Sequence, residues 1–304
     1  MKWQAIVLGQ VLALLDTVTG VFTDLLAEQN VYVPVFQMCC LYFCLWLYLP
    51  KLSKPGLRHQ SLWKFLLASL FDTQANVLSV VSYQLTSLPS AIILGDSALL
   101  WVVLFSHLFL KRRYSVRECI GVVLAVLGLM CIVVSDLRQA GWVWDGSMLG
   151  DVVALGSAVL YAASNVFQEY LVTTGTKSYE FLAILGVISF GITLVESLIL
   201  EIHSITALQS VVSGLSLSGF VVCMLGFYSL TPYYFQCYGA SLFNMSLLAS
   251  NVYALLFSVF LFHQSLQWLY FLGFAFVAAG ILLYSYQPVS KGSSLLTAEA
   301  SEIT

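Results

Sequence analysis

Acidic side chains stand in the middle of several long apolar segments, where they could contact a solute or carry a proton. Asp16, Asp72 and Asp96 each lie within an apolar segment of about twenty residues. An ionisable side chain at the centre of a bilayer costs roughly 2.5–3.5 kcal/mol on insertion scales, so each acid needs a reason to be there. None of these segments carries lysine or arginine at mid-depth. We therefore expect these acids to contact a donor group of the solute or to carry protons.

Neutral polar side chains recur beside the acids at helical spacing. Steps of three or four residues place side chains on one face of a helix, and Thr19 and Thr23 follow Asp16 at such steps. The candidates for substrate binding or proton coupling are Asp16, Thr19, Thr23, Asp72, Asn76, Tyr83, Asp96, Tyr161, Asn165 and Asn251. The alternative is that the neutral members hydrogen-bond between helices and serve only packing. For Asp16 and Asp72, a cavity-lining role is the favoured interpretation.

The apolar segments indicate a membrane protein. Hydrophobic residues make up 60% of the 304 positions and charged residues 9%, whereas soluble domains have about 25% charged residues. A helix needs about 20 apolar residues to cross the hydrocarbon core, and ten such segments can be drawn. They are 4–26, 31–49, 62–86, 89–110, 117–135, 148–171, 180–201, 211–230, 238–262 and 266–286. Little of the chain remains outside them, so we expect no soluble catalytic domain.

The basic residues orient the ten segments. Of the 12 Lys and Arg residues, all but Arg138 fall on one side of the membrane when the N-terminus is placed in the cytoplasm. Positive charge in short loops stays on the cytoplasmic side during insertion. We therefore predict a multi-pass protein with both termini in the cytoplasm. The plasma membrane and the endomembranes are both compatible with these features.

Weak internal similarity indicates a duplication. Residues 104–106 match residues 256–258, and Glu28 after the first segment matches Glu169 in the sixth. Because five segments is an odd number, the second copy must insert upside down relative to the first, as in many secondary transporters. The predicted fold is an all-α membrane protein with ten transmembrane helices in two inverted five-helix repeats. The expected units are an N-terminal repeat (1–135), an outer linker (136–147), a C-terminal repeat (148–286) and a disordered cytoplasmic tail (287–304).

Sequence motifs of other functions are missing. The chain contains no phosphate-binding loop of the Gly-x-x-x-x-Gly-Lys-Ser/Thr type and no His-Glu-x-x-His or Gly-x-Ser-x-Gly string. Its cysteines and histidines have no metal-site spacing, and its basic loops lack the interleaved aromatic residues of nucleic-acid-binding surfaces. We expect no cofactor, no metal and no nucleic-acid partner. The expected partners are a small-molecule solute and the lipid bilayer.

Small residues form a face on the fifth and tenth segments. Gly121, Ala125 and Gly128 share one face of the fifth, and Gly273 and Gly280 recur on the tenth. Such faces let helices approach closely. They predict either a homodimer through spans five and ten or packing of these two helices within one chain.

Three strings in the chain resemble a known family. They are Asp72-x-Gln74-Ala75-Asn76 with Tyr83-Gln84-x-Thr86-Ser87, Gly150-Asp151 with Leu160-Tyr161-Ala162-x-Ser164-Asn165-Val166-x-x-Glu169-Tyr170, and Tyr228-Ser229-x-x-Pro232. They are similar to the solute carrier 35 family, most closely its F branch, in the drug/metabolite transporter superfamily. The resemblance covers nearly the whole chain. It implies ten helices in two inverted halves around a cavity lined by spans one, three, four, six, eight and nine. The chain departs from the family pattern at Gln74, where glutamate is common, so the resemblance implies no proton-carrying role there.

The leading functional interpretation is a secondary transporter, not an enzyme, that works by alternating access. Its expected solute is small, organic and neutral or weakly basic, with nucleobase- and nucleoside-like molecules among the candidates. One alternative is a nucleotide-sugar antiporter of the endomembrane system, the activity of better-known family members. That interpretation ranks lower because a buried diphosphate needs cationic partners. The alternative of another class is an intramembrane enzyme that uses paired aspartates.

Overall fold

The described part of the chain is helical throughout. The computed structural model describes residues 3–51, 61–86, 88–139, 148–205, 210–262 and 268–286, and it contains no strand within these ranges. The helices are α1 (Trp3–Ala27), α2 (Pro34–Cys44), the 3₁₀ helix η1 (Leu45–Lys51), α4 (Leu62–Leu85), α5 (Leu88–Asp96), α6 (Ala98–Phe109), α7 (Val116–Gln139), α8 (Met148–Thr173), α9 (Ser178–Leu200), α10 (Ile202–Ile205), α11 (Val211–Tyr238), α12 (Ala240–Phe262) and α13 (Trp268–Ser285).

Five of these helices are long and apolar enough to cross a membrane on their own. They are Trp3–Ala27, Leu62–Ser82, Met148–Thr173, Ser178–Leu200 and Val211–Tyr238. Large apolar side chains cover the outside of the bundle, for example Val195 (57% exposed) and Leu198 (51% exposed) on α9. An apolar exterior of this kind suits a hydrocarbon environment and not water. The described chain is thus an all-helical protein with the surface of a membrane protein.

Two predicted segments are interrupted in the structure. The second changes from α2 to the 3₁₀ helix η1 at Leu45, and η1 contains Pro50, which has no N–H to donate to an α-helical bond. The fourth is divided into α5 and α6 at Ser97, whose hydroxyl donates to the carbonyl of Leu94 at 2.5 Å. Side-chain bonds of this kind compete with the backbone bonds of a helix. Conversely, the eighth segment was predicted to end at residue 230, but α11 continues through Pro232 to Tyr238.

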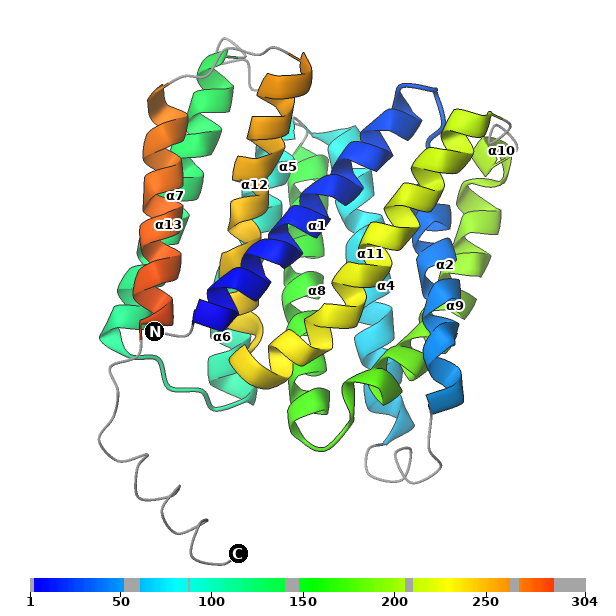
Figure 1. Ribbon diagram of the computed structural model, residues 1–304, viewed down its shortest axis with the longest axis horizontal. Coiled ribbons are helices and arrows are strands. Elements are labelled where there is room, and N and C mark those ends of the chain that lie inside the picture. Colours follow the sequence, from blue (N-terminus) through cyan, green and yellow to red (C-terminus); the bar gives the residue numbers. More distant parts are fainter. Residues whose placement is uncertain are drawn as a thin grey trace, which may run out of the picture.

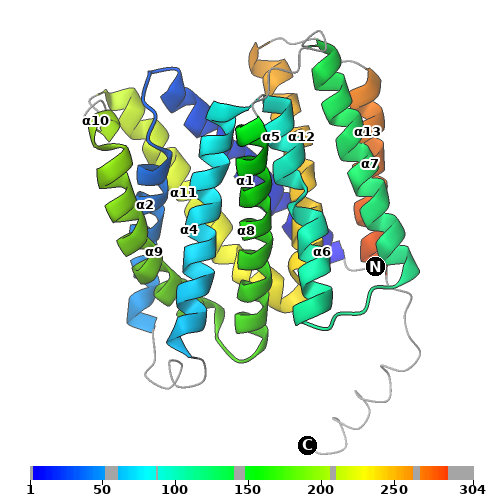
Figure 2. The same ribbon diagram turned by 180° about the vertical axis from the view of Figure 1, so that it is seen from behind.

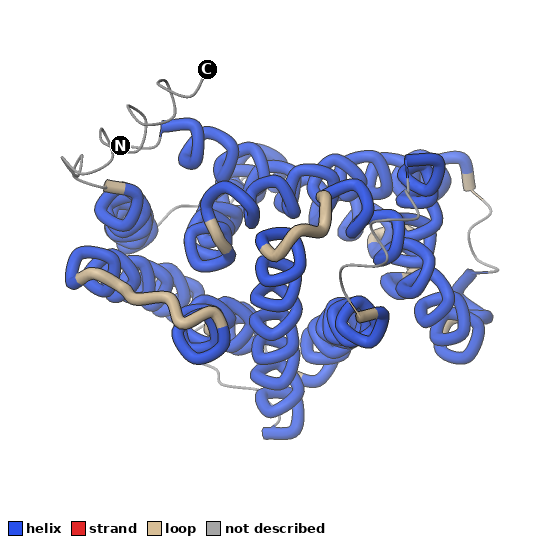
Figure 3. The backbone as a smooth tube through the Cα atoms, turned by 90° about the horizontal axis from the view of Figure 1, so that it is seen from below, coloured by secondary structure: helices blue, strands red, loops and turns tan. Residues whose placement is uncertain are grey.

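The helices pack in matched pairs. Figure 1 shows α1 and α11 running side by side across one face, and Figure 2 shows α4 and α8 side by side on the opposite face. The pair α7–α13 lies at one end of the molecule and the pair α2–α9 at the other. Viewed along the bundle in Figure 3, α1, α11, α4 and α8 occupy the space between these two end pairs. The first helix begins, and α13 ends, at the same end of the bundle.

The pair α7–α13 is held by the small-residue faces noted in the sequence. A Cβ atom added at Gly128 would lie 2.7 Å from the carbonyl oxygen of Gly273, and one added at Gly280 would lie 2.6 Å from that of Gly121. Only glycine lets the two backbones come so close. The two faces therefore pack on each other within one chain. A homodimer through these helices stays a prediction, and it would have to use their other faces.

Candidate functional site

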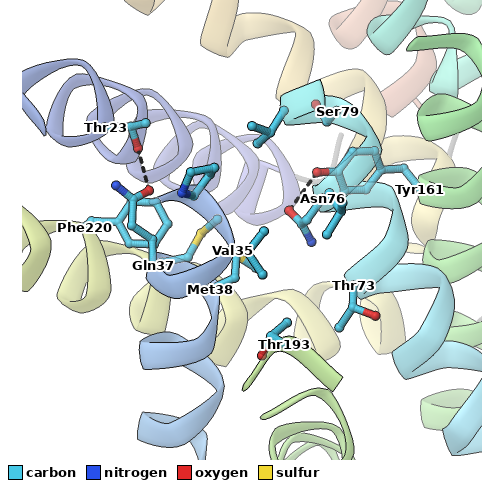
Figure 4. Close-up of a pocket in the computed structure, with 14 residues that line it drawn as sticks. Thr23, Val35, Gln37, Met38, Thr73, Asn76, Ser79, Tyr161, Thr193 and Phe220 are labelled. Carbon is cyan, nitrogen blue, oxygen red and sulfur yellow. Dashed lines mark hydrogen bonds between the residues drawn. The ribbon is translucent and has the colours of Figure 1, made fainter. Parts of the chain in front are cut away.

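A cavity of about 120 Å³ lies between six helices in the half of the bundle where α2 begins. Its walls come from α1, α2, α4, α8, α9 and α11 (Figure 4). The lining residues are Thr23, Pro34, Val35, Gln37, Met38, Thr73, Asn76, Val77, Ser79, Val80, Tyr161, Thr193, Phe220 and Met224. None of these side chains carries a charge. Hydroxyls and carboxamides alternate with apolar and aromatic groups, the composition expected of a pocket for a small organic molecule.

Two hydrogen bonds within the wall fix its polar groups. Tyr161 donates its hydroxyl to Oδ1 of Asn76 at 2.8 Å, which ties α8 to α4. Thr23 donates its hydroxyl to Oε1 of Gln37 at 3.2 Å, which ties α1 to α2. Both bonds are drawn in Figure 4, where the two pairs lie on opposite sides of the cavity. These contacts orient the carboxamides before any solute arrives, so less ordering remains to be done on binding.

Asp72 lies one helical turn below Asn76, beneath the cavity, at a contact of four helices. Its Oδ2 accepts the hydroxyls of Tyr42 on α2 at 2.5 Å and Tyr228 on α11 at 2.9 Å. Its Oδ1 faces the hydroxyl of Ser164 on α8 at 3.4 Å. The carboxylate is 5% exposed, and donors from three other helices compensate part of the cost of burying it.

Asn76 links the backbone of Asp72 to the cavity wall. Its Nδ2 donates to the backbone carbonyl of Asp72 at 2.7 Å while its Oδ1 accepts Tyr161 in the wall. Thr73, the residue after Asp72, also lines the cavity. The wall and the buried carboxylate of Asp72 therefore belong to the same turn of α4.

Two further aspartates, Asp16 and Asp96, lie near each other between α1, α12 and the break between α5 and α6. Asn251 donates its Nδ2 to Oδ2 of Asp96 at 2.6 Å, and Ser250, the residue before Asn251, lies beside Asp16. The two carboxylates interact electrostatically across this contact. Three predicted residues, Asp16, Asp96 and Asn251, thus come together, but none of them lines the cavity described above.

The remaining predicted residues are divided between wall and packing roles. Thr23, Asn76 and Tyr161 line the cavity. Thr19 donates its hydroxyl to the carbonyl of Asp16 at 2.6 Å, within its own helix. Asn165 donates to Oδ1 of Asn244 at 3.3 Å and joins α8 to α12. Tyr83 belongs to α4, but its side chain lies outside the described residues.

Some wall and carboxylate contacts were not predicted from the sequence. Gln37 is part of the wall, and Tyr42 and Tyr228 bind Asp72. Gln37 sits among apolar residues without an acidic neighbour on its helix, and Tyr42 stands in an aromatic stretch typical of packing. Tyr228 carried one signal, because it opens the string that resembles the family.

A polar cluster closes the opposite end of the bundle, where α8 ends and α12 begins. Glu169 accepts the backbone N–H of Ala240 at 2.8 Å, so it caps the start of α12. Arg112 pairs with Glu118 at 3.7 Å. Gly239 has φ +86°, and a Cβ there would lie 2.5 Å from Nη1 of Arg112 and 2.9 Å from Oε1 of Glu169. The loop after α6, the end of α8 and the start of α12 therefore meet in one contact.

Metal ligation has no support in the described residues, since no three His, Cys, Asp or Glu side chains gather there as a ligand set. The arrangement can instead bind an uncharged solute in the wall and hold carboxylates beneath and beside it. An apolar helical bundle with an internal, partly polar cavity is the architecture of membrane transport proteins.

Comparison with known proteins identifies the family. The family model SLC35F, described as Solute carrier family 35, matches residues 1–286. A mouse protein, Solute carrier family 35 member F2, is 31% identical over 297 residues, which cover 94% of this chain and 79% of that protein. An uncharacterized solute carrier family 35 member of Schizosaccharomyces pombe is also 31% identical, and the match covers 93% of this chain and 57% of that protein. The chain thus spans a little over half the length of the yeast relative.

A solved crystal structure shares this fold. It superposes with a TM-score of 0.72 at 14% identity, over 94% of this chain and 97% of the other.

The chain belongs to Solute carrier family 35. It is therefore an integral, multi-pass membrane transporter of the drug/metabolite superfamily, as the sequence strings indicated.

Proposed function

We propose that this protein is a secondary transporter that moves a small neutral or weakly basic organic solute by alternating access. The observation that carries this proposal is the cavity, whose lining offers hydroxyls, carboxamides and apolar surface but no charge. Such a wall can bind the hydrogen-bonding edge and the apolar face of a heterocycle, including a nucleobase- or nucleoside-like molecule. A diphosphate would lose its hydration there without gaining a cationic partner. The cavity therefore favours a neutral solute over a nucleotide sugar.

The two ends of the bundle support a cycle of alternating access. The cavity lies toward the end where α2 begins, and the contact of Asp72 with two tyrosines lies beneath it. The cluster of Arg112 and Glu169 joins the helices at the opposite end. A transporter that opens to one side must close the other. In our proposal, the structure represents the state of the transport cycle in which the cavity lies toward the end of the bundle where α2 begins.

The carboxylates supply the coupling in this scheme. Asp72 directly precedes the lining residue Thr73, and Asn76 of the wall donates to its backbone carbonyl, so a movement of this turn of α4 can couple proton uptake at Asp72 to solute binding. Asp16 and Asp96 form a separate acidic contact beside the cavity. We assign proton coupling to Asp72 first, because its partners come from three of the helices that also form the wall.

The helix contacts favour ten spans in two inverted repeats. In the predicted repeat, α1 corresponds to α8 and α4 to α11, and the two cross-pairs α1–α11 and α4–α8 both pack extensively. Likewise, α1 packs on α12, and α8 on α5 and α6. Helix ends next to Lys51, Lys64 and Lys177 lie at the end where α1 begins. This placement supports cytoplasmic termini by the positive-inside rule, with units 1–135 and 148–286 joined by an outer linker.

The test is a flux measurement with purified protein in liposomes. An untargeted mixture of cellular metabolites is offered outside, and the trapped compounds are compared with those in empty liposomes. We expect neutral or weakly basic compounds to be enriched inside the liposomes and to be recovered with unchanged mass. Enrichment of nucleotide sugars instead would favour the antiporter, and a chemically altered product would favour an enzyme.

A further inference from the structure

Glu201, the residue immediately after α9, is bound to the first turn of α2. Its Oε1 accepts the backbone N–H of Val35 at 2.9 Å, and its Oε2 accepts that of Phe36 at 2.8 Å. The glutamate is 7% exposed. It is separated from its partners by more than half of the chain, so this is a tertiary contact between the ends of two different helices.

The contact supplies what α2 lacks in its own sequence. The first N–H groups of a helix have no partner within the helix. In α2 the first position is Pro34, which has no N–H, and the cap residue Val33 makes no side-chain capping bond. The N–H groups of the next two residues, Val35 and Phe36, both donate to Glu201. A carboxylate is also the charge that the positive end of a helix dipole favours.

The turn held in this way is part of the cavity wall. Pro34 and Val35 line the cavity, and Gln37 and Met38 of the following turn line it as well. Thr193 contributes to the same wall from α9, the helix that leads to Glu201. Farther along α9, a Cβ added at Gly186 would lie 2.7 Å from Cβ of Leu45, so α9 is also closely packed at the far end of α2.

We propose that Glu201 is a positioning residue of the solute cavity: it fixes the first turn of α2 against α9 and thereby sets the position of the cavity wall on that side. The inference rests on the proposed function, because it takes this cavity to be the solute site. Glu201 itself does not line the cavity and acts through the backbone of α2.

The contact depends on the protonation of Glu201. Burial raises the pKa of Glu201 above its usual range, and the backbone hydrogen bonds from Val35 and Phe36 oppose that shift. As pH falls, the carboxylate is therefore lost at a higher pH than in an exposed glutamate, and a protonated acid can no longer accept both N–H groups as a charged cap. Cys39 on α2 faces Glu201 as a further titratable group, and Glu196 on α9 is bonded to Gln74.

The test measures access to the wall without any solute. In a protein whose native cysteines are replaced by alanine, which also removes Cys39, single cysteines are placed at Val35 on α2 and at Thr73 on α4. A membrane-impermeant methanethiosulfonate reagent is the probe, and the readout is the labelling rate at position 35 divided by that at position 73. The ratio cancels the common effect of pH on thiol reactivity.

Three variants at two positions are compared in this background. Glu201→Gln keeps the size but cannot accept both N–H groups, so it should raise the ratio about fivefold, the shift that a lost helix cap typically produces. Glu201→Asp keeps the charge on a shorter side chain and should fall between Glu201→Gln and the parent. Glu28→Gln removes a charge from an exposed side chain near the end of α1 and should leave the ratio unchanged.

The pH profile separates positioning from a general loss of stability. The parent ratio should rise as pH falls, whereas Glu201→Gln should give a high ratio that does not change with pH. A parent ratio that is flat with pH, or a Glu201→Gln ratio equal to the parent, would overturn the inference. If Glu201→Gln does not accumulate, Glu201→Asp and the parent pH profile decide alone. Because no solute is used, a failure of the flux measurement would count against the proposed function and leave this result intact.

Discussion

Replacing Asp72 with asparagine removes the acid at the four-helix contact and keeps the size of the side chain. The asparagine oxygen can take the position of Oδ2 and accept the hydroxyls of Tyr42 and Tyr228. The loss is then the charge-assisted part of two hydrogen bonds, about 1 kcal/mol each and about 2 kcal/mol together. The neutral side chain also avoids the roughly 2.5–3.5 kcal/mol cost of a carboxylate at mid-membrane. We therefore expect the free energy of unfolding to rise by only about 0.5–1.5 kcal/mol.

Transport should respond quite differently from stability. We expect Asp72→Asn to reach the membrane in normal amount but to lose most of its solute flux, or the pH dependence of that flux between about pH 5 and pH 8. The assay is initial uptake into liposomes of a solute identified by the metabolite screen, with thermal unfolding measured on the same preparation. Asp24→Asn is the matched control, because Asp24 is an exposed aspartate near the end of α1. Normal uptake by Asp72→Asn across this pH range would refute the coupling role.

Two further predictions test the ends of the transport path. Gly239→Ala should lower the free energy of unfolding by about 1–3 kcal/mol, because only glycine adopts this backbone conformation without strain. Gly191→Ala is the control and should not lower it, because a Cβ at Gly191 meets open space. Equal melting temperatures of the two variants in detergent would contradict backbone strain at position 239. A cysteine at Tyr161 should be protected from a water-soluble thiol reagent by bound solute. A cysteine at Asn165, which is buried against α12, should react slowly with or without solute. Protection at both positions, or at neither, would show that the residues of the cavity wall are assigned incorrectly.

The helices themselves could be predicted closely from the sequence. Apolar length alone located them to within a few residues in most cases, since a span has to bury or expose apolar side chains along its whole length. The interruptions were harder to predict. The break at Ser97 depends on a hydroxyl that bonds its own backbone, and serine occurs in many unbroken membrane helices. α11 continues past Pro232, although a proline in a helix interior removes one backbone hydrogen bond.

Only part of the candidate site can be predicted from a sequence, for a physical reason. Spacing along one helix shows which side chains share a face, and Asn76, a candidate chosen from such spacing, lines the cavity. It cannot show which residue of another helix meets that face. The two tyrosines that bind Asp72, and the bond from Glu201 to α2, join segments far apart in sequence. Such contacts follow only from the three-dimensional packing of the helices.

The most direct test of the account is to fill the cavity and measure flux. Ser79→Trp places a large side chain in the wall, and Leu70→Trp places the same side chain on α4 at a position that is 39% exposed on the outside of the bundle. Both variants are incorporated into liposomes at equal amounts and offered the same metabolite mixture as the parent. The account predicts that Ser79→Trp loses the uptake of every compound that the parent enriches, while Leu70→Trp keeps it. Uptake by Ser79→Trp that equals that of Leu70→Trp would show that the solute does not pass through this cavity.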